Sequence, residues 1–572
     1  MNSPQSSPSS TSAPSVPDIR RTRRRVALSS AAVLALAVPL GVCGTSAQAQ
    51  AQTDAGAIRL LADSSASGPG PASGSAFLAG LGLEQWNTQN VAPGVRVSTV
   101  TLQNQGSAPF WTVTLEQPVT SKVTLGPARA EVESESWART TAAQLAAHGF
   151  AARVEAVRWP GYSDTPRGLM GYRVRVGEFP SSGAAGTELS AITAAGFAAV
   201  TEWTGYDAQT PADRENIHVA VIARGAFRGT VEATHDGNVA QRATTSSVAA
   251  QLGSLVGVNG GFFVTSNADG VQGTQSGLGA YDGQVQSLSS GDRAALVVKN
   301  NGKGGYQIAN LTSTATVRSG AATFAVEGVN RVPGTVRDCG RPDATPTTHP
   351  EQDVDCYETN DLVQFTPEFA APLPTGTGTQ AVLDAAGKVL SVGARGGAVP
   401  AGGTVLQGIG TAAAWLDAHA VVGHRLTVDQ RIVDSATGRT VHLGPNDSIV
   451  SAAPRLLRDG RIDIDAADEG VVDPRDLSFN YQWANARQPR TIAGVDARGD
   501  LILVTVDGRL TAGSEGFTLY EEAEFMRSLG AVQALNLDGG GSTAMAVDGR
   551  LVNNTSDATG ERPVGDTIQV LP

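Results

Sequence analysis

The stretch "NLDGGGSTAMAV", residues 536–547, places three consecutive glycines directly after an aspartate. A glycine inside a strand adds backbone entropy that folding must remove, and it offers no side chain for packing. A run of three therefore indicates a loop whose backbone lies very close to another group. Asp538 precedes the glycines, and Ser542 and Thr543 follow them. The segment is therefore a candidate binding loop that begins where an apolar strand ends.

The common glycine-rich binding motifs do not fit this loop. No Gly-Lys-[Ser/Thr] follows it, so it is not a Walker A loop, and the G-x-G-x-x-G of dinucleotide-binding folds is absent. A calcium loop needs carboxylates at alternate positions, and only Asp538 precedes the glycines. The seven histidines form no metal-like pair. We therefore predict no cofactor and assign no metal ligands, although a divalent metal stays open.

The bulk composition limits the class of protein. A chain of 572 residues is too long for one ordinary domain, so two or more are expected. The formal net charge of -12 gives no nucleic-acid signature. Hydrophobic residues make up 41% of the chain, which supports real cores, and the 67 glycines and 29 prolines indicate many turns in a β-rich α+β fold.

The N-terminus has the composition of an export signal. Five arginines between residues 20 and 25 precede the apolar run "VALSSAAVLALAVPLGV" at 26–42, and an Ala-x-Ala cleavage site follows at 47–49. We expect residues 1–49 to be a signal peptide with a disordered Ser/Pro-rich extension. A single membrane anchor is the alternative, but the run is short and contains Pro39.

The rest of the chain agrees with export. Residues 50–85 are small, polar and rich in glycine and proline, as in a flexible linker. No second apolar span of membrane length follows, so we expect a secreted or cell-wall-associated bacterial protein without a stable membrane span. Beyond the predicted cleavage site only Cys339 and Cys356 remain, and an even pair in an exported chain predicts one disulfide.

Two segments precede the large C-terminal domain. Residues 86–107 contain an alternating strand, and residues 108–205 have the order β-α-β-β-α-β of a ferredoxin-like unit. At "YRVRVGEF", residues 172–179, this unit resembles the SPOR domains, which bind peptidoglycan. The resemblance implies peptidoglycan as a partner. A ferredoxin-like domain without affinity for glycans is the alternative.

Residues 206–572 are predicted to form one large β-rich α+β domain. Short apolar strands are separated by turn dipeptides that favour hairpins. These are Asp282-Gly283, Asn301-Gly302, Asp459-Gly460, Asp507-Gly508 and Asp548-Gly549. One clear helix is expected at 518–530, with Thr518 as its N-cap and Glu521 completing a capping box.

Four other stretches of this domain accompany the glycine loop. They are "GVNGGFF" at 257–263, "QPRTIAGVD" at 488–496, "VDGRLTAGSEGFTLYEEAEF" at 506–525 and "ERPVGD" at 561–566. Taken singly, each has an ordinary interpretation as a turn, a surface arginine or a helix cap. Taken together and in this order, they resemble the phosphodiester glycosidase family from residue 214 to the end of the chain. The strand within 86–107 resembles the usual start of that domain, which would make 108–205 an insertion.

The resemblance implies cleavage of a sugar-1-phosphodiester at the anomeric carbon. Arginine forks bind phosphate bidentately, and a loop of glycines lets backbone amides approach phosphate or sugar oxygens. A carboxylate would act at the oxocarbenium-like centre, and Asp538 is the first candidate, before Asp507 and Glu521. Glu521 is equally well explained as a helix cap. The candidate substrate-binding residues are Asn259, Gly260, Gly261, Phe262, Arg490, Asn536, Gly539, Gly540, Gly541, Ser542, Thr543 and Arg562.

Two other functions fit the same sequence. The first is a non-catalytic cell-wall protein whose glycine loop only binds anionic glycan. The second is a glycosidase that acts on phosphate-free polysaccharide. The leading hypothesis is a hydrolase that cleaves GlcNAc-1-phosphodiester-like linkages in envelope or extracellular glycans, held on the wall by residues 108–205.

Overall fold

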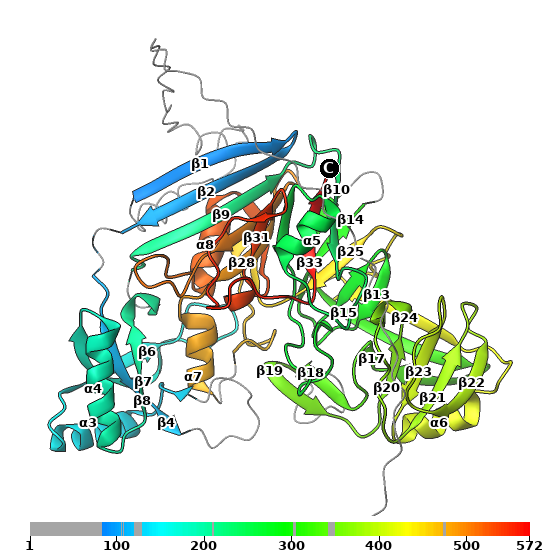
Figure 1. The fold of residues 1–572 in the computed structure, drawn as a ribbon, viewed down its shortest axis with the longest axis horizontal. Helices are drawn as coiled ribbons and strands as arrows, with labels where there is room; N and C mark the ends of the chain where they lie inside the picture. Colours follow the sequence, from blue (N-terminus) through cyan, green and yellow to red (C-terminus); the bar gives the residue numbers. More distant parts are fainter. Residues whose placement is uncertain are drawn as a thin grey trace, which may run out of the picture. The chain divides into compact units, whose positions relative to one another are not determined.

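The computed structural model describes residues 83–104, 106, 108–118, 129–208, 211–300, 305–340, 349–472 and 476–572. The expected signal peptide, most of the linker and the Asn301-Gly302 turn lie outside these residues. The described part is rich in strands and has few helices, so the predicted α+β class is confirmed (Figure 1). Within it, no helix is both long enough and apolar enough to cross a membrane.

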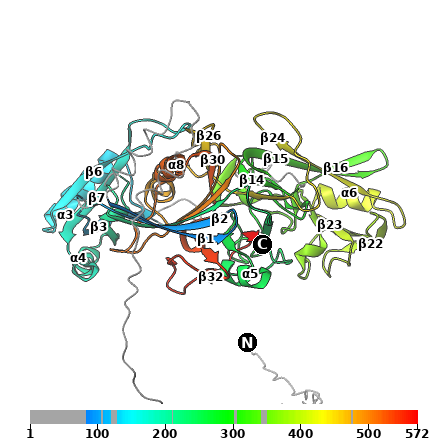
Figure 2. The same cartoon turned by 90° about the horizontal axis from the view of Figure 1, so that it is seen from above.

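The largest sheet has eight strands, and every neighbouring pair in it is antiparallel. Its order is β1 (Leu83–Ala92), β2 (Val95–Gln103), β9 (Arg214–Ile222), β29 (Leu501–Val506), β28 (Arg490–Asp496), β30 (Ala531–Asn536), β26 (Arg455–Arg458) and β27 (Arg461–Ile462). The central strands β28 and β29 are buried along their whole length, which explains their unbroken apolar sequences. The helix α8 (Leu519–Ser528) contacts β30 and β26 (Figure 2).

The strands β1 and β2 come from the segment that precedes residues 108–205. β2 pairs with β9, which pairs with β29, and β29 pairs in turn with the motif strand β28. Val95, Val97, Val100 and Leu102 of β2 lie in the same core cluster as Val504 of β29. The chain therefore leaves this sheet after β2, forms a separate unit and returns to the sheet at β9.

A second sheet has five strands and also carries site motifs. Its order is β10 (Thr230–Thr234), β33 (Thr567–Leu571), β11 (Val256–Asn259), β31 (Met545–Val547) and β32 (Arg550–Leu551). The helix α5 (Thr245–Leu252) packs against β11 and β31. Val256 and Val258 of β11 belong to the same core cluster as the eight-stranded sheet, so the two sheets share one core.

Two further sheets build the region between residues 279 and 451. The first contains β13 (Gln284–Ser287), β12 (Gly279–Tyr281), β25 (Ser448–Ser451), β14 (Ala294–Lys299), β15 (Gly305–Ser319), β16 (Ala322–Val326) and β24 (Thr427–Asp434). The second contains β17 (Gly328–Val329), β20 (Leu362–Phe365), β23 (Thr404–Gly408), β21 (Thr379–Leu383) and β22 (Val389–Ala394), with helix α6 (Thr411–His419) against β21 and β23. The strands β18 (Thr335–Cys339) and β19 (Pro350–Tyr357) pair only with each other.

Residues 108–205 form a unit with its own core. Its four-stranded sheet has the order β6 (Ala152–Arg158), β7 (Leu169–Phe179), β3 (Trp111–Leu115) and β8 (Ala199–Trp203). The helices α3 (Glu135–Ala147) and α4 (Ser182–Ala194) lie between these strands in the chain, so the elements follow one another in the order that the sequence predicts. A short hairpin of β4 (Gln117–Pro118) and β5 (Arg129–Ala130) is added. The SPOR-like character of the unit stays a prediction.

Of the turn dipeptides that the structure describes, three form the predicted hairpin turns and one does not. Asp282-Gly283, Asp459-Gly460 and Asp548-Gly549 all have left-handed φ angles at both positions, as two-residue hairpin turns require. The hairpin turn predicted at Asp507-Gly508 is wrong. Asp507 is buried and its backbone N–H donates to Asn216 O at 2.9 Å, because the chain leaves β29 there to enter the site region.

The predicted helix near residue 518 is confirmed. Thr518 caps α8, and Glu521 completes the capping box through bonds in both directions. The helix ends at Ser528. Leu529 is its C-cap residue, and Gly530 follows with a φ of 88°. The helices α5, α6 and α7 of this domain were not predicted.

Candidate functional site

The predicted motifs meet at one edge of the largest sheet. The strand β28 begins at Arg490, whereas its antiparallel neighbours β29 and β30 end there, at Val506 and Asn536. In an antiparallel sheet the start of one strand lies beside the ends of its neighbours, so three loops leave the sheet together. The backbone N–H of Asp538 donates to Gly260 O, which follows β11, at 3.1 Å. This bond ties the glycine loop to the "VNGG" segment.

A cavity of about 380 Å³ opens among these loops. Of the predicted site residues, Phe262, Arg490, Asp538, Gly539, Gly540, Gly541 and Arg562 line it. Six residues outside the quoted motifs also line it, namely Thr265, Gln352, Asp353, Phe479, Gln482 and Trp483, and so does Arg509 of the "VDGR" motif. The cavity therefore combines aromatic rings, three arginines and two carboxyl groups, which is the mixture expected of a site for a sugar that carries an anionic group.

The glycines of the loop are needed because other parts of the protein come very close to them. A Cβ at Gly539 would lie 2.8 Å from Pro489 O, and one at Gly541 would lie within 2.3 Å of the Asp557 carboxylate. Gly540 has a φ of 59°, and its N–H donates to Pro489 O at 2.9 Å. The loop is thus pinned against the segment that leads into β28, and its backbone forms part of the cavity surface.

Asp538 lies on the floor of the cavity. Its Oδ1 accepts a hydrogen bond from its neighbour Gly539 N at 2.9 Å. The pKa of this carboxyl is raised from 3.8 to about 7, chiefly by desolvation and in part by the nearby charge of Asp353, while Ser542 and Arg562 oppose the shift. A carboxyl whose pKa lies near neutral pH, in a cavity beside cationic groups, is a functional candidate on physical grounds.

Three arginines surround the same space. Arg490 donates from Nε to Phe517 O at 2.9 Å and from Nη2 to Trp483 O at 3.0 Å, and its Nε lies 3.0 Å from Glu522 Oε1. These contacts fix the guanidinium at the start of β28. In the part of the chain that the structure describes, Nη1 of Arg490 makes no protein hydrogen bond, so it is available to a ligand.

Arg562 and Arg509 differ in how they are held. Arg562 donates to the Asp557 carboxylate from Nε at 2.9 Å and from Nη2 at 3.1 Å. Arg509 donates only to the Gln488 amide oxygen, at 2.5 Å, and forms no ion pair within the described residues. Burial lowers the pKa of Arg509, and the charges of Arg490 and Arg562 lower it further. This mutual repulsion shows that the three arginines concentrate positive charge in one place, where an anion would relieve it.

The "VNGG" segment supports the glycine loop. Asn259 is fully buried, and its Nδ2 donates to Asp538 O at 2.7 Å. Its Oδ1 accepts from Thr491 Oγ1 at 2.7 Å and from Ala544 N at 3.1 Å. Asn259 therefore joins three segments below the cavity and does not line it.

Gly260 and Gly261 lie too close to other groups to carry a side chain. A Cβ at Gly260 would approach Asp566, and one at Gly261 would approach Ser451 O, both at 2.3 Å. Phe262 does reach the cavity, where its ring meets Trp483 edge to face with centroids 5.8 Å apart.

The structure does not bring two of the three predicted catalytic carboxylates to the cavity. Asp507 is fully buried and accepts from Asn554 N at 3.1 Å and from Asn554 Nδ2 at 2.7 Å. Its burial raises the pKa to about 6, but its contacts hold two loops together. Glu521 caps α8 and forms an ion pair with Arg487 at 2.6 Å. Both residues thus have structural partners outside the cavity.

Three predicted binding residues also lie outside the cavity lining. Asn536 donates to Ala453 O at 2.6 Å beneath the loop. Ser542 and Thr543 are buried in the turn that follows the glycines, and Ser542 interacts with the Asp538 carboxyl. They shape the loop from below.

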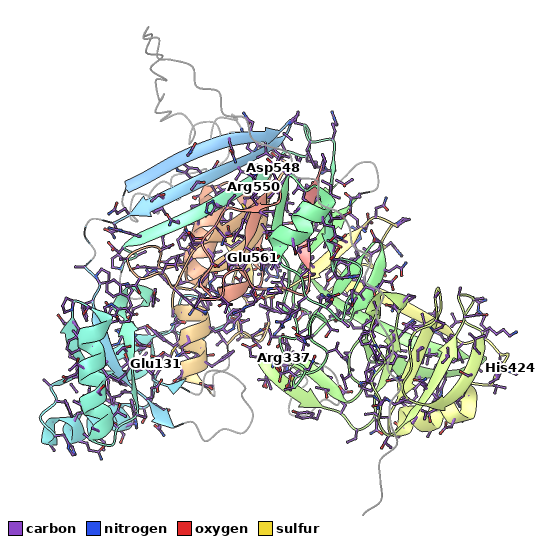
Figure 3. The ribbon with its side chains drawn as sticks, in the orientation of Figure 1. Glu131, Arg337, His424, Asp548, Arg550 and Glu561 are labelled. Carbon is purple, nitrogen blue, oxygen red and sulfur yellow. A yellow bond between two sulfur atoms is a disulfide. The ribbon has the colours of Figure 1, made fainter. Side chains whose placement is uncertain are left out.

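The residues that sequence reasoning missed come mainly from two segments. Phe479, Gln482 and Trp483 belong to the helical segment α7 (Leu477–Asn480) and η3 (Tyr481–Asn485), which leads into the "QPRTIAGVD" motif. Gln352 and Asp353 belong to the β18–β19 hairpin, on which Arg337 also lies (Figure 3). Arg509 stood inside the quoted "VDGR" motif and could have been found there.

The predicted disulfide is confirmed, and it belongs to this hairpin. Cys339 of β18 and Cys356 of β19 are bonded, with their Cα atoms 5.3 Å apart. Both cysteines are fully buried.

A group of acidic side chains lies elsewhere. Among the described residues, Glu327, Glu358 and Asp361 are close enough together to hold a cation. Arg331 already binds both oxygens of Asp361, at 2.9 and 2.6 Å, and none of these residues lines the cavity.

Comparison with known proteins gives three kinds of match. Residues 377–571 match the family model described as phosphodiester glycosidase. N-acetylglucosamine-1-phosphodiester alpha-N-acetylglucosaminidase of Mus musculus is 34% identical over 116 residues, which cover 20% of this chain and 22% of the mouse protein. The uncharacterized SPbeta prophage-derived protein YomE of Bacillus subtilis is 42% identical over 90 residues, 15% of this chain and 14% of that protein. The chain thus spans 22% of the length of the mouse relative and 14% of that of YomE.

A solved structure is similar over a much larger part of the chain. The crystal structure of a protein from Burkholderia pseudomallei K96243 is 32% identical and superposes with a TM-score of 0.76, covering 86% of this chain and 96% of that one. The match to the family model contains the glycine loop, Arg490, Arg509 and Arg562. The chain therefore contains a phosphodiester glycosidase family domain, matched over residues 377–571.

Proposed function

We propose that this protein is a secreted hydrolase that cleaves sugar-1-phosphodiesters, such as GlcNAc-1-phosphodiesters, in envelope or extracellular glycans. The reaction releases a free sugar and a phosphate monoester. The observation that carries this proposal is the placement of Arg490, Arg509 and Arg562 around Asp538 in a single cavity. A neutral polysaccharide carries no negative charge to offset the positive charge of the three arginines. Their placement therefore favours a phosphorylated substrate.

The three arginines would contribute unequally to phosphate binding, because only two of them have a carboxylate partner among the described residues. Arg490 and Arg562 are held by Glu522 and Asp557, which keeps each guanidinium in a fixed orientation. Arg509 lacks such a partner among the described residues and lies beside Gly540, whose Cβ would be 3.5 Å from its guanidinium. The phosphodiester would therefore gain most from Arg509, because that charge is not already balanced by a carboxylate.

Asp538 supplies the group that acts on the sugar. Phosphate is a good leaving group, so the C1–O bond needs little acid assistance, and the main need is to stabilise positive charge at C1. An ionised Asp538 on the cavity floor meets that need. The aromatic rings of Phe262 and Trp483 would contact the sugar, as aromatic side chains do in apolar parts of ligand sites.

The test is product analysis on defined substrates. The full-length protein is incubated with a methyl diester of N-acetylglucosamine 1-phosphate and with teichoic-acid-like polymers, and the products are identified by mass. We expect free sugar and the phosphate monoester, and we expect the Asp538→Asn variant to lose at least about 100-fold in kcat. Asp548→Asn is a matched control in an exposed turn and should keep wild-type activity. Absence of turnover on every phosphodiester, or cleavage of phosphate-free polysaccharide at the same rate, would overturn the proposal.

The second part of the proposal concerns location. The N-terminal arginines and apolar run support export, and the disulfide suits an oxidising compartment. Attachment to peptidoglycan through residues 108–205 is supported by a hollow of about 450 Å³ beside the β6–β7–β3–β8 sheet, lined in part by Phe110, Glu155, Arg173 and Arg175. An aromatic ring and charged groups around such a space suit a polar glycan.

Sedimentation with purified sacculi tests the attachment. The full-length protein should pellet with sacculi, and Phe110→Ala should weaken this binding without changing turnover of a small phosphodiester. Leu169→Ala is the matched control, because its side chain is also on this unit, on β7, and is 48% exposed. If the wild-type protein stays in the supernatant, residues 108–205 do not bind peptidoglycan.

A further inference from the structure

The β18–β19 hairpin carries an irregularity at the point where it reaches the cavity. The register of the two strands shifts between Arg337 and Cys339, so extra residues of β19 face β18 there. Asp338 and Asp353 both have left-handed φ angles, of 58° and 63°. A bulge of this kind re-aims side chains and is common beside active sites. Here the bulge contains Asp353, which lines the cavity.

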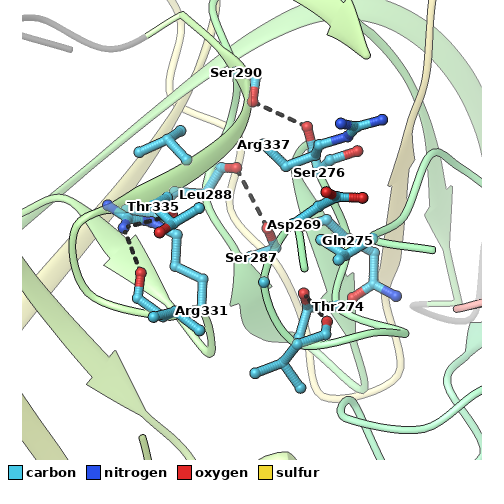
Figure 4. Close-up of a pocket in the computed structure, with 15 residues that line it drawn as sticks. Asp269, Thr274, Gln275, Ser276, Ser287, Leu288, Ser290, Arg331, Thr335 and Arg337 are labelled. Carbon is cyan, nitrogen blue, oxygen red and sulfur yellow. Dashed lines mark hydrogen bonds between the residues drawn. The ribbon is translucent and has the colours of Figure 1, made fainter. Parts of the chain in front are cut away.

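Asp353 is held firmly by its own hairpin. Arg337 donates from Nη2 to Asp353 Oδ1 at 2.7 Å and from Nη1 to Asp353 O at 3.1 Å. The backbone N–H of Asp353 donates to Asp338 Oδ1 at 2.9 Å. Arg337 also lines a small pocket with Asp269 (Figure 4). Two contacts thus hold the backbone of Asp353 and one holds its carboxylate, which limits the orientations of the side chain.

The hairpin is in turn connected to the wall of the cavity. Asp338 accepts an ion pair from Arg293 at 3.0 Å, and both side chains are almost fully buried. The Arg293 guanidinium lies over the ring of Phe262, 5.5 Å from its centroid. The disulfide joins Cys339 on one side of the bulge to Cys356 on the other. Asp353 is therefore placed relative to the cavity by a continuous set of packed and charged contacts.

The carboxyl of Asp353 keeps one oxygen available. Its Oδ1 is taken by Arg337, but in the described part of the chain no hydrogen bond involves Oδ2, and the side chain is 38% exposed. Asp353 and Asp538 line the same cavity, and the charge of Asp353 contributes to the raised pKa of Asp538. Two carboxyl groups that interact across one cavity are the arrangement that glycoside hydrolysis requires.

The two carboxyl groups have different charged neighbours. Arg562 is among the charges that act on Asp538, whereas the arginines that act on Asp353 are Arg337 and Arg293. Of the three arginines that would bind phosphate, Arg562 is thus the one that acts on Asp538. Water has to attack C1 from the face opposite the departing phosphate, and the carboxyl that Arg337 holds is the candidate for activating it.

We propose that Asp353 is the general base of the reaction, which takes the proton from the water that attacks the sugar. This inference rests on the proposed function. As the water oxygen bonds to C1, the C1–O bond to phosphate breaks and its electron pair leaves with the phosphate monoester. The proton of the water passes to Asp353 Oδ2, while Arg337 holds Oδ1, and the ionised Asp538 stabilises the positive charge at C1.

The test compares two aspartates of the same hairpin. Asp355 also contacts Arg337, at 3.4 Å, but does not line the cavity, so Asp355→Asn is the matched control for a purely structural effect. On the methyl diester of N-acetylglucosamine 1-phosphate, Asp353→Asn should lower kcat by about 10² to 10⁴-fold and change KM little. Asp355→Asn should stay within a few-fold of wild type. Added azide should partly restore turnover of Asp353→Ala and yield a glycosyl azide, because this anion needs no base.

The outcomes separate this inference from the proposed function. If the wild-type protein cleaves the diester but Asp353→Asn keeps half of its kcat or more, Asp353 is not the base and the proposed function stands. Equal losses in Asp353→Asn and Asp355→Asn, without azide rescue, would mean that Asp353 only holds the hairpin. Circular dichroism and melting curves of both variants show whether either has failed to fold. An inactive wild-type protein would overturn the function itself.

Discussion

At the scale of single residues, the cavity separates groups that are already paired from groups that are not. Arg490 and Arg562 have carboxylate partners, and Asp507 and Glu521 are occupied by Asn554 and Arg487. A group whose polar atoms are all engaged has little left to offer a ligand, because binding would first have to break its existing contacts, whereas Arg490 and Asp353 are paired but each keep one atom without a partner among the described residues. The unbalanced charges that face the cavity are therefore the better guide to function.

Arg509 gives the first prediction at this scale. Its guanidinium lacks a carboxylate partner among the described residues, so a bound phosphate would become its counterion. A hydrogen bond to a charged group contributes about 1.5–3 kcal/mol, so Arg509→Ala should lower kcat/KM for a phosphodiester about 10 to 100-fold. Arg550→Ala, at an exposed position, is the control. Steady-state kinetics check this, and an unchanged kcat/KM in Arg509→Ala would remove the residue from phosphate binding.

Asp538 gives a prediction about stability against pH. Its folded pKa of about 7 lies above the value of about 4 expected for an unfolded aspartate. Between these values the folded state binds more protons than the unfolded state, so ionising Asp538 costs stability as the pH rises from 4 to 7. Asp538→Asn removes this cost. Melting curves should show that the variant gains stability relative to wild type as the pH rises through this window, with no further gain above it.

Ionisation of Asp538 should raise activity, although it lowers the stability of the folded state. The proposed role requires the ionised form, so kcat/KM of the wild-type protein should fall as the pH drops below about 7. A melting difference between Asp538→Asn and wild type that is the same at every pH would show that the pKa of this carboxyl is not raised in the folded protein.

At the scale of elements, local sequence patterns succeed where the cause is local. Thr518 and Glu521 cap α8 because both bonds form within one helical turn. The helix α5 also carried such signals, since Thr244 caps it and Gly253 ends it with a φ of 66°, but its Ser/Thr-rich start resembles a loop. The turn expected at Asp507 failed because its partner, Asn554, is distant in the sequence. Asp353 was missed for the same reason, since only the paired strands β18 and β19 bring it to the cavity.

The hairpin gives the prediction at this scale. The C339A/C356A double variant removes the disulfide that closes β18 onto β19. For a loop of this length the bond stabilises the folded state by about 3 kcal/mol, so the melting temperature should fall. If the hairpin positions Asp353, kcat should fall as well, at a temperature where the variant is still folded. Full kcat in the folded variant would show that the bulge and Arg337 alone suffice to hold Asp353.

At the scale of the whole molecule, the chain leaves the largest sheet after β2 and forms the unit at residues 108–205. This unit contacts the helical segment α7–η3, whose residues line the cavity. Tyr481 of η3 donates to Asp207 Oδ1 at 2.8 Å and accepts from Arg173 of β7. Val132, Val157 and Met170 of the unit share a core cluster with Tyr481 and Ala486. Phe479, Gln482 and Trp483, which flank Tyr481 in the chain, line the cavity. One short helical segment therefore has the inserted unit on one side and the cavity on the other.

This arrangement predicts that the inserted unit supports catalysis, in addition to the attachment proposed for it. Tyr481 does not line the cavity, so Tyr481→Ala should leave the chemistry of Asp538 intact. It would, however, leave a void between the unit and η3, and it would take a hydrogen-bond partner from the buried Asp207 and Arg173. Because Trp483 contacts both Phe262 and Arg490, displacement of η3 should raise KM for the phosphodiester more than it lowers kcat.

Kinetics on the full-length protein decide this point, with Tyr520→Ala as the control, since that tyrosine is 42% exposed on α8. Both variants are first checked for a cooperative melting transition, because a buried truncation of this size costs about 3–5 kcal/mol. A folded Tyr481→Ala protein with wild-type KM and kcat would contradict the prediction. The inserted unit would then be an independent attachment module, and the wall of the cavity would be held by Arg490 and Phe262 without its help.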